Sequence, residues 1–290
     1  MKVCVTGAAG FIGRHVCAEL YRRGHTVRAM DVTPCSLAQG VWIPADITKP
    51  LDRIPDLDAV IHLAAVANPR ECDANPTKAF DVNVNGTHQV LKMALESGAK
   101  RVVFSSTAHV YGISPHYLPT PETHPLWLQN NYTLTKILGE QLCQLYHENH
   151  GLSYAALRLY NAYGPGQAQG YFIPDMLAKA KGGDFKVQGA NTTKDWVHIS
   201  DVAQAFVRAL ETQFVGPINV GTGVETDLAT IAHTIADVHG VTCEEAYDPN
   251  ATRMCADNSR AKRILGWQPT VSVEDGLHAL CNETKPQPVR

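Results

Sequence analysis

Long apolar runs and targeting signals are missing from this sequence. No stretch of the 290 residues approaches the roughly 20 consecutive apolar residues that a membrane-spanning helix needs. The segment after Met1 also lacks the charged, apolar and small-residue regions of a secretory signal. We therefore expect a cytoplasmic protein with no membrane partner.

Charge of one sign is equally scarce. The 25 basic and 28 acidic residues are mixed along the chain and leave a net charge of -3. Proteins that bind nucleic acid usually carry a basic patch or stripe. We therefore expect no nucleic-acid partner.

Cysteine and histidine spacings typical of metal sites are also missing. The eight cysteines form no C-x-x-C pair, and the 13 histidines show no zinc-ligand spacing. Several cysteines stand in apolar runs, which is typical of small, reduced core residues in a reducing compartment. We expect reduced thiols and no metal.

What the chain does have is a regular alternation of short apolar runs and longer helical patterns, which predicts a parallel sheet covered on both faces. The predicted strands are Lys2–Thr6, Thr26–Asp31, Val41–Asp46, Ala59–Ala64, Arg101–Ser106, Ser153–Tyr160 and Pro217–Val220. The predicted helices among them are Phe11–Arg23, Thr77–Ser97 and Tyr132–Asn149, each followed by a glycine that ends it.

The alternation changes after Gly164, where Pro165, Gly166, Gly170 and Pro174 interrupt the chain. Helical patterns then dominate, at Asp175–Lys181, Asp201–Thr212, Asp227–His239 and Ser259–Leu265. We expect an α/β fold, a Rossmann-like doubly wound sheet with a small, mostly helical C-terminal lobe. The sheet domain would span 1–165 with 195–225 returning to it, and the lobe would span 166–194 and 226–290.

A glycine-rich turn follows the first predicted strand, in the segment TGAAGFIG that begins at Thr6. Gly7, Gly10 and Gly13 permit a tight turn and a close approach of backbone to phosphate. Phe11 and Ile12 open the following helix, whose free N–H groups favour a pyrophosphate. The turn therefore predicts a dinucleotide site.

Asp31 ends the second strand, about twenty residues further on, where an acidic side chain accepts hydrogen bonds from the adenosine ribose. It would repel a 2′-phosphate, and no basic residue follows it in the next three positions, so NAD is favoured over NADP. Further cofactor contacts are expected where later strands end, at Asp46, Ile47, Leu63, Ala64 and Ala65. The larger domain would then be the NAD-binding domain.

Tyr132 and Lys136 stand four positions apart on a predicted helix and share one face. A nearby ammonium lowers a phenol pKa, which would let Tyr132 act as a base. Thr107, at the end of a strand rich in hydroxyl side chains, is placed to share the reacting oxygen. We expect Thr107, Tyr132 and Lys136 to be catalytic, and Ser105, Tyr132 and Lys136 to contact the cofactor.

Over almost its whole length the chain resembles an extended short-chain dehydrogenase/reductase of the NAD-dependent epimerase/dehydratase family, similar to UDP-glucose 4-epimerase. The segments that carry the resemblance, besides the turn, Asp31 and the Tyr132–Lys136 pair, are Asp46–Ile47, His62–Ala65, Asn83–Thr87, Ser105–Gly112, Leu157–Pro165, Asp195–Ala203, Asn219–Gly221 and Leu265–Pro269. The resemblance implies that Tyr160 contacts the nicotinamide side and Asn161 the substrate diphosphate. It also implies a homodimer formed through Thr77–Ser97 and Tyr132–Asn149.

The chain departs from the family pattern at three places. Sugar dehydratases of the family carry an Asp-Glu pair after the catalytic threonine, where this chain has Ala108 and His109. Lys194 stands where epimerases usually carry a diphosphate-binding arginine, and Arg253 is the available substitute for a second one. We place His109, Lys194 and Arg253 among the substrate contacts, with Thr107 and Asn161.

Three functions compete. A nucleotide-sugar 4-epimerase would pass through a transient 4-keto intermediate and consume no cofactor. An NAD-dependent reductase, dehydrogenase or dehydratase acting on a keto-sugar or other small carbonyl compound is the main alternative. A catalytically silent NAD-binding protein is disfavoured, because both Tyr132 and Lys136 are present.

Overall fold

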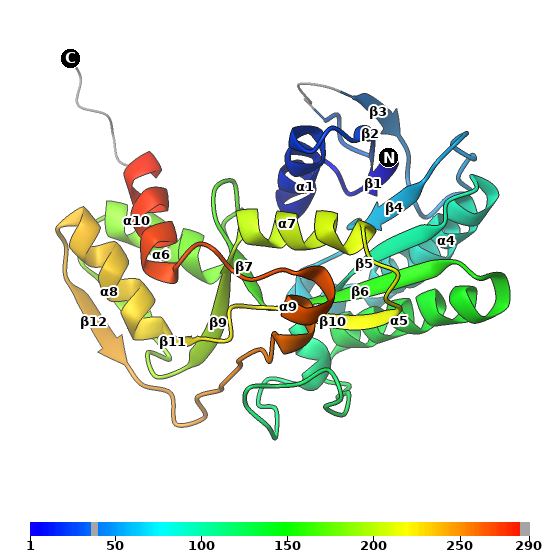
Figure 1. Ribbon diagram of the computed structural model, residues 1–290. Coiled ribbons are helices and arrows are strands. Elements are labelled where there is room, and N and C mark those ends of the chain that lie inside the picture. The colour runs from blue at the N-terminus through cyan, green and yellow to red at the C-terminus, as the bar shows by residue number, and fades with distance from the viewer. Residues whose placement is uncertain (36–39, 285–290) are drawn as a thin grey trace, which may run out of the picture.

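A seven-stranded parallel sheet forms the centre of the larger part of the molecule (Figure 1). The computed structural model describes residues 1–35 and 40–284. The strands lie in the order β10-β6-β5-β4-β1-β2-β3, which confirms the Rossmann-like fold. Their bounds are β1 (Lys2–Thr6), β2 (Thr26–Asp31), β3 (Val41–Pro44), β4 (Ala59–His62), β5 (Arg101–Thr107), β6 (Ser153–Leu159) and β10 (Gly216–Val220).

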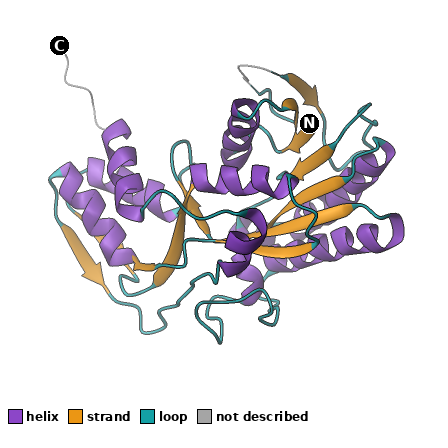
Figure 2. Cartoon of the chain, in the orientation of Figure 1, coloured by secondary structure: helices purple, strands orange, loops and turns teal. Residues whose placement is uncertain are grey.

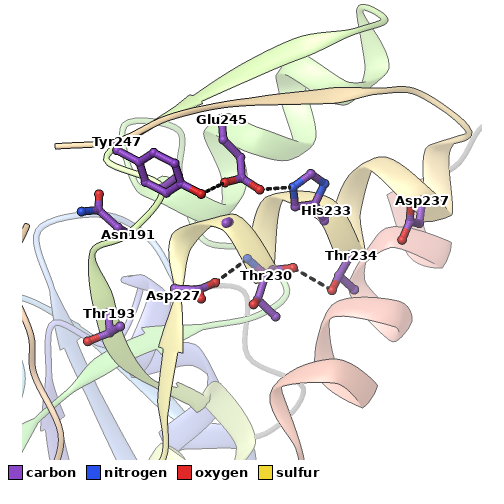
Figure 3. A pocket seen from close by; sticks show the side chains of 11 residues that line it. Asn191, Thr193, Asp227, Thr230, His233, Thr234, Asp237, Glu245 and Tyr247 are labelled. Carbon is purple, nitrogen blue, oxygen red and sulfur yellow. Dashed lines mark hydrogen bonds and ion pairs between the residues drawn. The ribbon is translucent and has the colours of Figure 1, made fainter.

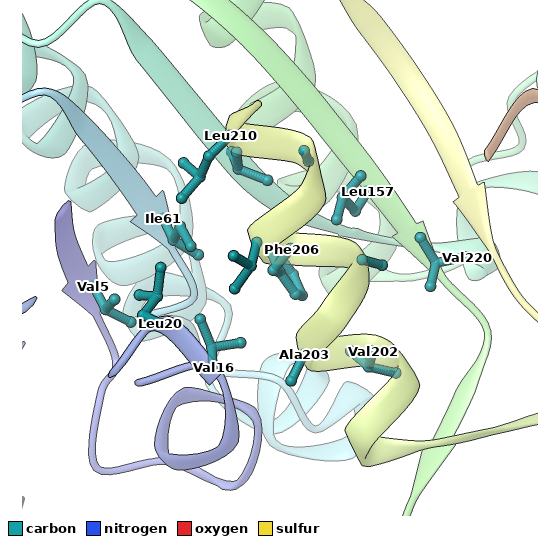
Figure 4. Packing of buried hydrophobic residues seen from close by; sticks show 14 of the residues in the cluster. Val5, Val16, Leu20, Ile61, Leu157, Val202, Ala203, Phe206, Leu210 and Val220 are labelled. Carbon is teal, nitrogen blue, oxygen red and sulfur yellow. The ribbon is translucent and has the colours of Figure 1, made fainter. Parts of the chain in front are cut away.

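Helices cover both faces of this sheet because its strands are apolar on both sides. On one face α1 (Phe11–Arg22) packs beside α7 (Ile199–Leu210), and Leu20 and Phe206 meet the strand residue Ile61 there (Figure 4). The opposite face is covered by α4 (Gly86–Glu96) and α5 (Asn131–His150). Each large apolar side chain buried in these layers contributes about 1.5–3 kcal/mol, so this part of the chain forms a stable platform for the strand ends.

The helix predicted over Thr77–Ser97 is confirmed, but it contains a π-helical turn that the sequence did not predict. The chain there forms α3 (Pro76–Phe80), a π-helical turn (Asp81–Asn85) and α4. Within the wider turn, the Asn83 amide bonds both the N–H and the carbonyl of Val66, at 2.8 and 3.0 Å. These long-range bonds hold Asn83 within the wider turn. A periodic apolar pattern carries no information about them.

A smaller lobe has a core of its own in which α6 (Phe172–Lys181), α8 (Leu228–His239) and α10 (Val273–Thr284) pack together. It also contains five short strands that the sequence pattern did not predict (Figure 2). β7 (Asn161–Tyr163), β9 (Thr193–His198) and β11 (Glu225–Asp227) form one sheet, while β8 (Phe185–Gln188) pairs with β12 (Cys243–Ala246). Helix α10 was not predicted either.

Three short helical segments complete the fold: α2 (Pro69–Ala74), α9 (Ser259–Leu265) and the 3-10 turn Ala108–Tyr111. α9 and the following Trp267 pack against the core of the larger sheet. The C-terminal segment therefore contributes to both cores, and the expected boundaries of the two domains stay a prediction. Within the described ranges, no helix combines the length and apolar character needed to cross a membrane.

Candidate active site

The glycine turn has the geometry of a phosphate cradle. Gly7 has φ +70°, and a Cβ there would lie 2.7 Å from the Ala64 nitrogen. A Cβ on Gly13 would lie only 2.1 Å from the Gly7 carbonyl oxygen. Helix α1 begins after Gly10 without a side-chain cap, so its first N–H groups remain free to bind an anion. These residues fit a dinucleotide pyrophosphate.

Asp31 lies beside this turn at the end of β2. Its carboxylate accepts hydrogen bonds from the backbone N–H groups of Ala9 and Thr33, each at 2.9 Å. Each oxygen keeps a second lone pair for a ribose hydroxyl. Asp31 therefore joins the glycine turn to the position expected for the adenosine ribose.

The other predicted cofactor contacts follow β3 and β4. Asp46 accepts two hydrogen bonds from Thr48, which lower the pKa of the Asp46 carboxyl. Ile47 is buried and fills the space above Gly86. After β4, the chain at Leu63–Ala65 lies partly exposed against Gly7. The structure thus places these residues along one edge of the sheet, as a bound dinucleotide requires.

The expected catalytic residues come together where β5 ends and α5 begins. Lys136 donates a hydrogen bond from Nζ to the Ser105 carbonyl oxygen at 2.8 Å, and Nζ lies 5.9 Å from the centre of the Tyr132 ring. Thr107 is hydrogen-bonded to the Tyr132 hydroxyl. A phenol, a hydroxyl and an ammonium therefore lie near one another, as proton transfer at a substrate hydroxyl requires.

Burial controls the charges in this group. It raises the pKa of Tyr132 above its ordinary value, against the opposing effect of the Thr107 hydrogen bond. It also lowers the pKa of Lys136 to about 8. In the protein alone, desolvation outweighs the other effects on the Tyr132 phenol, and the Lys136 ammonium bonds Ser105, so the expected lowering of the phenol pKa by Lys136 stays a prediction.

Two expected substrate contacts from distant parts of the chain lie close together. Burial and the nearby Lys194 lower the pKa of His109 to about 4, so this imidazole is neutral at pH 7. Lys194, on β9, donates a hydrogen bond to Thr252 at 3.0 Å, and burial lowers its pKa to about 8. These two polar side chains thus bring the end of β5 close to β9 of the smaller lobe.

The other predicted contacts, Asn161, Tyr160 and Arg253, already have hydrogen-bond partners within the protein. Asn161 donates a hydrogen bond to the Asp195 carbonyl at 3.2 Å and is partly exposed. Tyr160 is buried, and its hydroxyl donates to the Cys255 carbonyl at 3.4 Å, so contact with the nicotinamide stays a prediction. Arg253 is exposed and holds Glu225 through two hydrogen bonds of 2.9 and 2.7 Å. A diphosphate role for Arg253 would require that pair to open.

The sequence analysis assigned no role to two residues beside the site. The buried Asp195 carboxylate accepts four hydrogen bonds, three from the backbone of Thr222, Gly223 and Ala256 and one from the Thr222 hydroxyl. It thereby fixes β9 to the chain that follows β10. Tyr171, in the smaller lobe, lies near enough to Tyr132 to raise its pKa. Asp195 stands in the Asp195–Ala203 segment that carries the family resemblance, which was the available signal. Tyr171 has no local signal, because it acts across the fold.

A separate depression of about 600 Å³ opens on the smaller lobe (Figure 3). In it Glu245 accepts hydrogen bonds from Tyr247 and bonds His233, at 2.7 and 2.8 Å. Of the described residues that line it, none belongs to the predicted site. The depression is thus separate from the predicted site at the strand ends of the larger sheet.

Comparisons with known proteins agree with this geometry. A model of the NAD dependent epimerase/dehydratase family matches residues 3–221. A putative UDP-glucose 4-epimerase of Methanocaldococcus jannaschii is 33% identical over 98% of both chains, and UDP-glucuronic acid decarboxylase 3 of Arabidopsis thaliana is 31% identical over 96% of this chain and 87% of its own. The solved structure of MoeE5 in complex with UDP-glucose and NAD superposes with a TM-score of 0.90 and 26% identity, covering 98% of each chain.

Proposed function

Because the chain belongs to the NAD-dependent epimerase/dehydratase family, we propose that it is a nucleotide-sugar 4-epimerase that works through a transient 4-keto sugar. The observation that carries this proposal is the group formed by Thr107, Tyr132 and Lys136 beside the glycine turn. It combines a proton acceptor with a binding site for a hydride carrier.

Each residue has a defined task in this reaction. Tyr132 takes the proton of the sugar 4-hydroxyl, and Thr107 holds the same oxygen by a hydrogen bond. Lys136 provides a positive charge beside the phenol while it is held against Ser105. NAD, when bound, supplies the acceptor and then the donor of the C4 hydride and adds a positive charge near the phenol. The 4-keto sugar rotates in the site and presents its other face before it is reduced. Tyr132 then returns the proton to the 4-oxygen.

The residues after Thr107 favour epimerisation over dehydration. Eliminating water needs an additional acid and base, and the chain offers Ala108 and a neutral His109 there. Lys194, Asn161 and, once released from Glu225, Arg253 would bind the diphosphate, with His109 facing the sugar. Similarity to a putative UDP-glucose 4-epimerase supports UDP-sugars as the first substrates to test.

The proposal is tested by incubating the purified protein and NAD with UDP-glucose, UDP-galactose and UDP-glucuronic acid. Proton NMR follows the sugars, and absorbance at the NADH maximum follows the cofactor in the same sample. Interconversion at C4 without NADH accumulation is the expected result. Release of carbon dioxide from UDP-glucuronic acid, or one NADH per product, would instead assign a decarboxylase or a net oxidoreductase.

Asp31 is expected to set the preference for NAD. Asp31→Asn keeps the shape of the side chain but removes the charge that repels a 2′-phosphate. Because hydrogen bonds to charged groups contribute about 1.5–3 kcal/mol, the ratio of the NADP and NAD dissociation constants should fall about tenfold. Calorimetric titration with both cofactors measures it. Asp56→Asn, at a highly exposed carboxylate, is the control, and an unchanged ratio in Asp31→Asn contradicts the assignment.

We further propose that two chains associate through α4 and α5. The outer side of α5 presents four apolar side chains that are partly exposed, Leu134, Leu138, Leu142 and Leu145. They recur at intervals of three or four, so they form one stripe along the helix. Light scattering should give twice the 31.6 kDa mass of the chain, and a concentration-independent mass of one chain would contradict a homodimer.

A further inference from the structure

A buried ion pair lies against the catalytic helix, outside the groups assigned to the reaction. Arg158 on β6 and Glu140 on α5 have side chains that are only 5% and 7% exposed. Arg158 donates to both carboxylate oxygens, from Nε at 2.9 Å and from Nη2 at 2.6 Å. Burying two charges is costly unless they are paired and hydrogen-bonded this closely. We therefore ask whether the pair positions the catalytic residues or affects their charge.

The pair also joins the two elements that carry the catalytic residues. Ser106 donates a hydrogen bond to Glu140 at 2.5 Å. Ser106 stands between Ser105, whose carbonyl accepts from Lys136, and Thr107, which bonds Tyr132. A displacement of Glu140 would therefore be transmitted to both neighbours of Ser106.

Glu140 is also one helical turn beyond Lys136, on the same face of α5. The ammonium faces the Phe104 ring of β5 at 5.2 Å and the Tyr132 ring of α5 at 5.9 Å. The other ionisable groups that act on it or sense its charge are His62 of β4 and Cys72 of α2.

Neither His62 nor Cys72 supplies a negative charge at neutral pH. Burial lowers the pKa of His62 to about 3 and raises the pKa of the Cys72 thiol, so both groups are neutral. Among the described groups that face the ammonium, the carboxylate of Glu140 is thus the source of stabilising charge. Its effect opposes burial, which favours the neutral amine of Lys136.

We propose that Glu140, held in place by Arg158 and Ser106, is a positioning residue that holds Lys136 in its charged form against Ser105. The inference rests on the proposed function only for the catalytic use of that charge. Arg158 acts through Glu140, because its guanidinium holds both carboxylate oxygens in place. The pair thus sets the charge of the lysine and the alignment of the strand that carries Thr107.

The test is an NMR titration of ligand-free protein labelled with ¹³C at lysine Cε, with Lys136→Met to assign the Lys136 signal. Glu140→Gln should move the titration midpoint of Lys136 down by about one pH unit, because losing a nearby anion favours the neutral amine. In active enzyme, the alkaline limb of kcat/KM should move down by the same amount. Glu148→Gln, an exposed glutamate on the same helix, should move neither.

A second variant covers the case in which Glu140→Gln leaves Arg158 unpaired and the chain does not fold. Glu140→Gln combined with Arg158→Met removes both charges and should still lower the Lys136 midpoint. If this variant also fails to fold, Glu140→Asp keeps the charge one methylene further away and should give a smaller downward shift. A wild-type midpoint in any of these folded variants overturns the inference. The titration needs no substrate, so its outcome is separate from that of the epimerase assay.

Discussion

Replacing Tyr132 by phenylalanine is expected to lower kcat about a thousandfold, within the range found for loss of a general acid-base group. Phenylalanine keeps the aromatic ring beside Lys136 but removes the hydroxyl that bonds Thr107. The dissociation constant for NAD should change less than about twofold, since a phenol that acts in the transition state adds little to cofactor binding. Steady-state kinetics and calorimetry measure the two quantities separately.

Tyr146→Phe is the matched control for this variant. Tyr146 lies on the same helix, and its hydroxyl contacts His88 at 3.2 Å, away from the strand ends that carry the site. We expect it to keep wild-type turnover. Wild-type turnover in Tyr132→Phe would show that another group takes the proton.

Gly13→Ala is expected to raise the dissociation constant for NAD more than about tenfold. The added methyl would lie 2.1 Å from the Gly7 carbonyl oxygen and 2.8 Å from the Ala8 Cα, both in the backbone of the phosphate turn. No side-chain rotation relieves these contacts, so the turn itself must open. Overpacking of this kind also costs about 1–3 kcal/mol of folding stability. Calorimetric titration with NAD and urea unfolding measure the two effects.

Gly182→Ala provides the comparison for this change. Gly182 ends α6 in the smaller lobe, has an ordinary backbone conformation, and its added Cβ would come no closer than 3.3 Å to a carbonyl oxygen. It should bind NAD as the wild type does. If Gly13→Ala also binds NAD with wild-type affinity, the pyrophosphate does not lie on this turn.

The elements of the larger sheet could be predicted because their signals are local. β1 and β2 have the predicted bounds, Lys2–Thr6 and Thr26–Asp31, since each is an apolar run that ends at a turn or a helix start. α9 also has the predicted bounds, Ser259–Leu265, with Gly266 ending it in the left-handed conformation. The glycine turn shares this property, because its spacing and its neighbours in the chain define it.

Elements held by distant partners could not be predicted in the same way. β8 is a four-residue strand that pairs with β12, far along the chain, and its alternating burial over Phe185–Gln188 is too short to stand out. The π-helical turn at Asn83 likewise depends on Val66, which lies in the loop after β4. In both cases tertiary contacts decide the local structure.

The site shows the same division. The four-residue spacing of Tyr132 and Lys136 placed both on one helix, as found. The charge states of Tyr132 and Lys136 could not be predicted from the sequence, because burial and the Ser105 carbonyl determine them. The proximity of His109 to Lys194 depends on how the smaller lobe returns to the sheet, which no local pattern contains.

The most direct test of the proposed epimerase uses UDP-glucose that carries deuterium at C4. A hydride that leaves C4 and returns to the other face of the same carbon never exchanges with water. We therefore expect UDP-galactose that retains deuterium at C4, formed in ordinary water without net NADH and about a thousandfold more slowly with Tyr132→Phe. Product that has lost the deuterium to solvent, or product formed together with an equal amount of reduced cofactor, would contradict it.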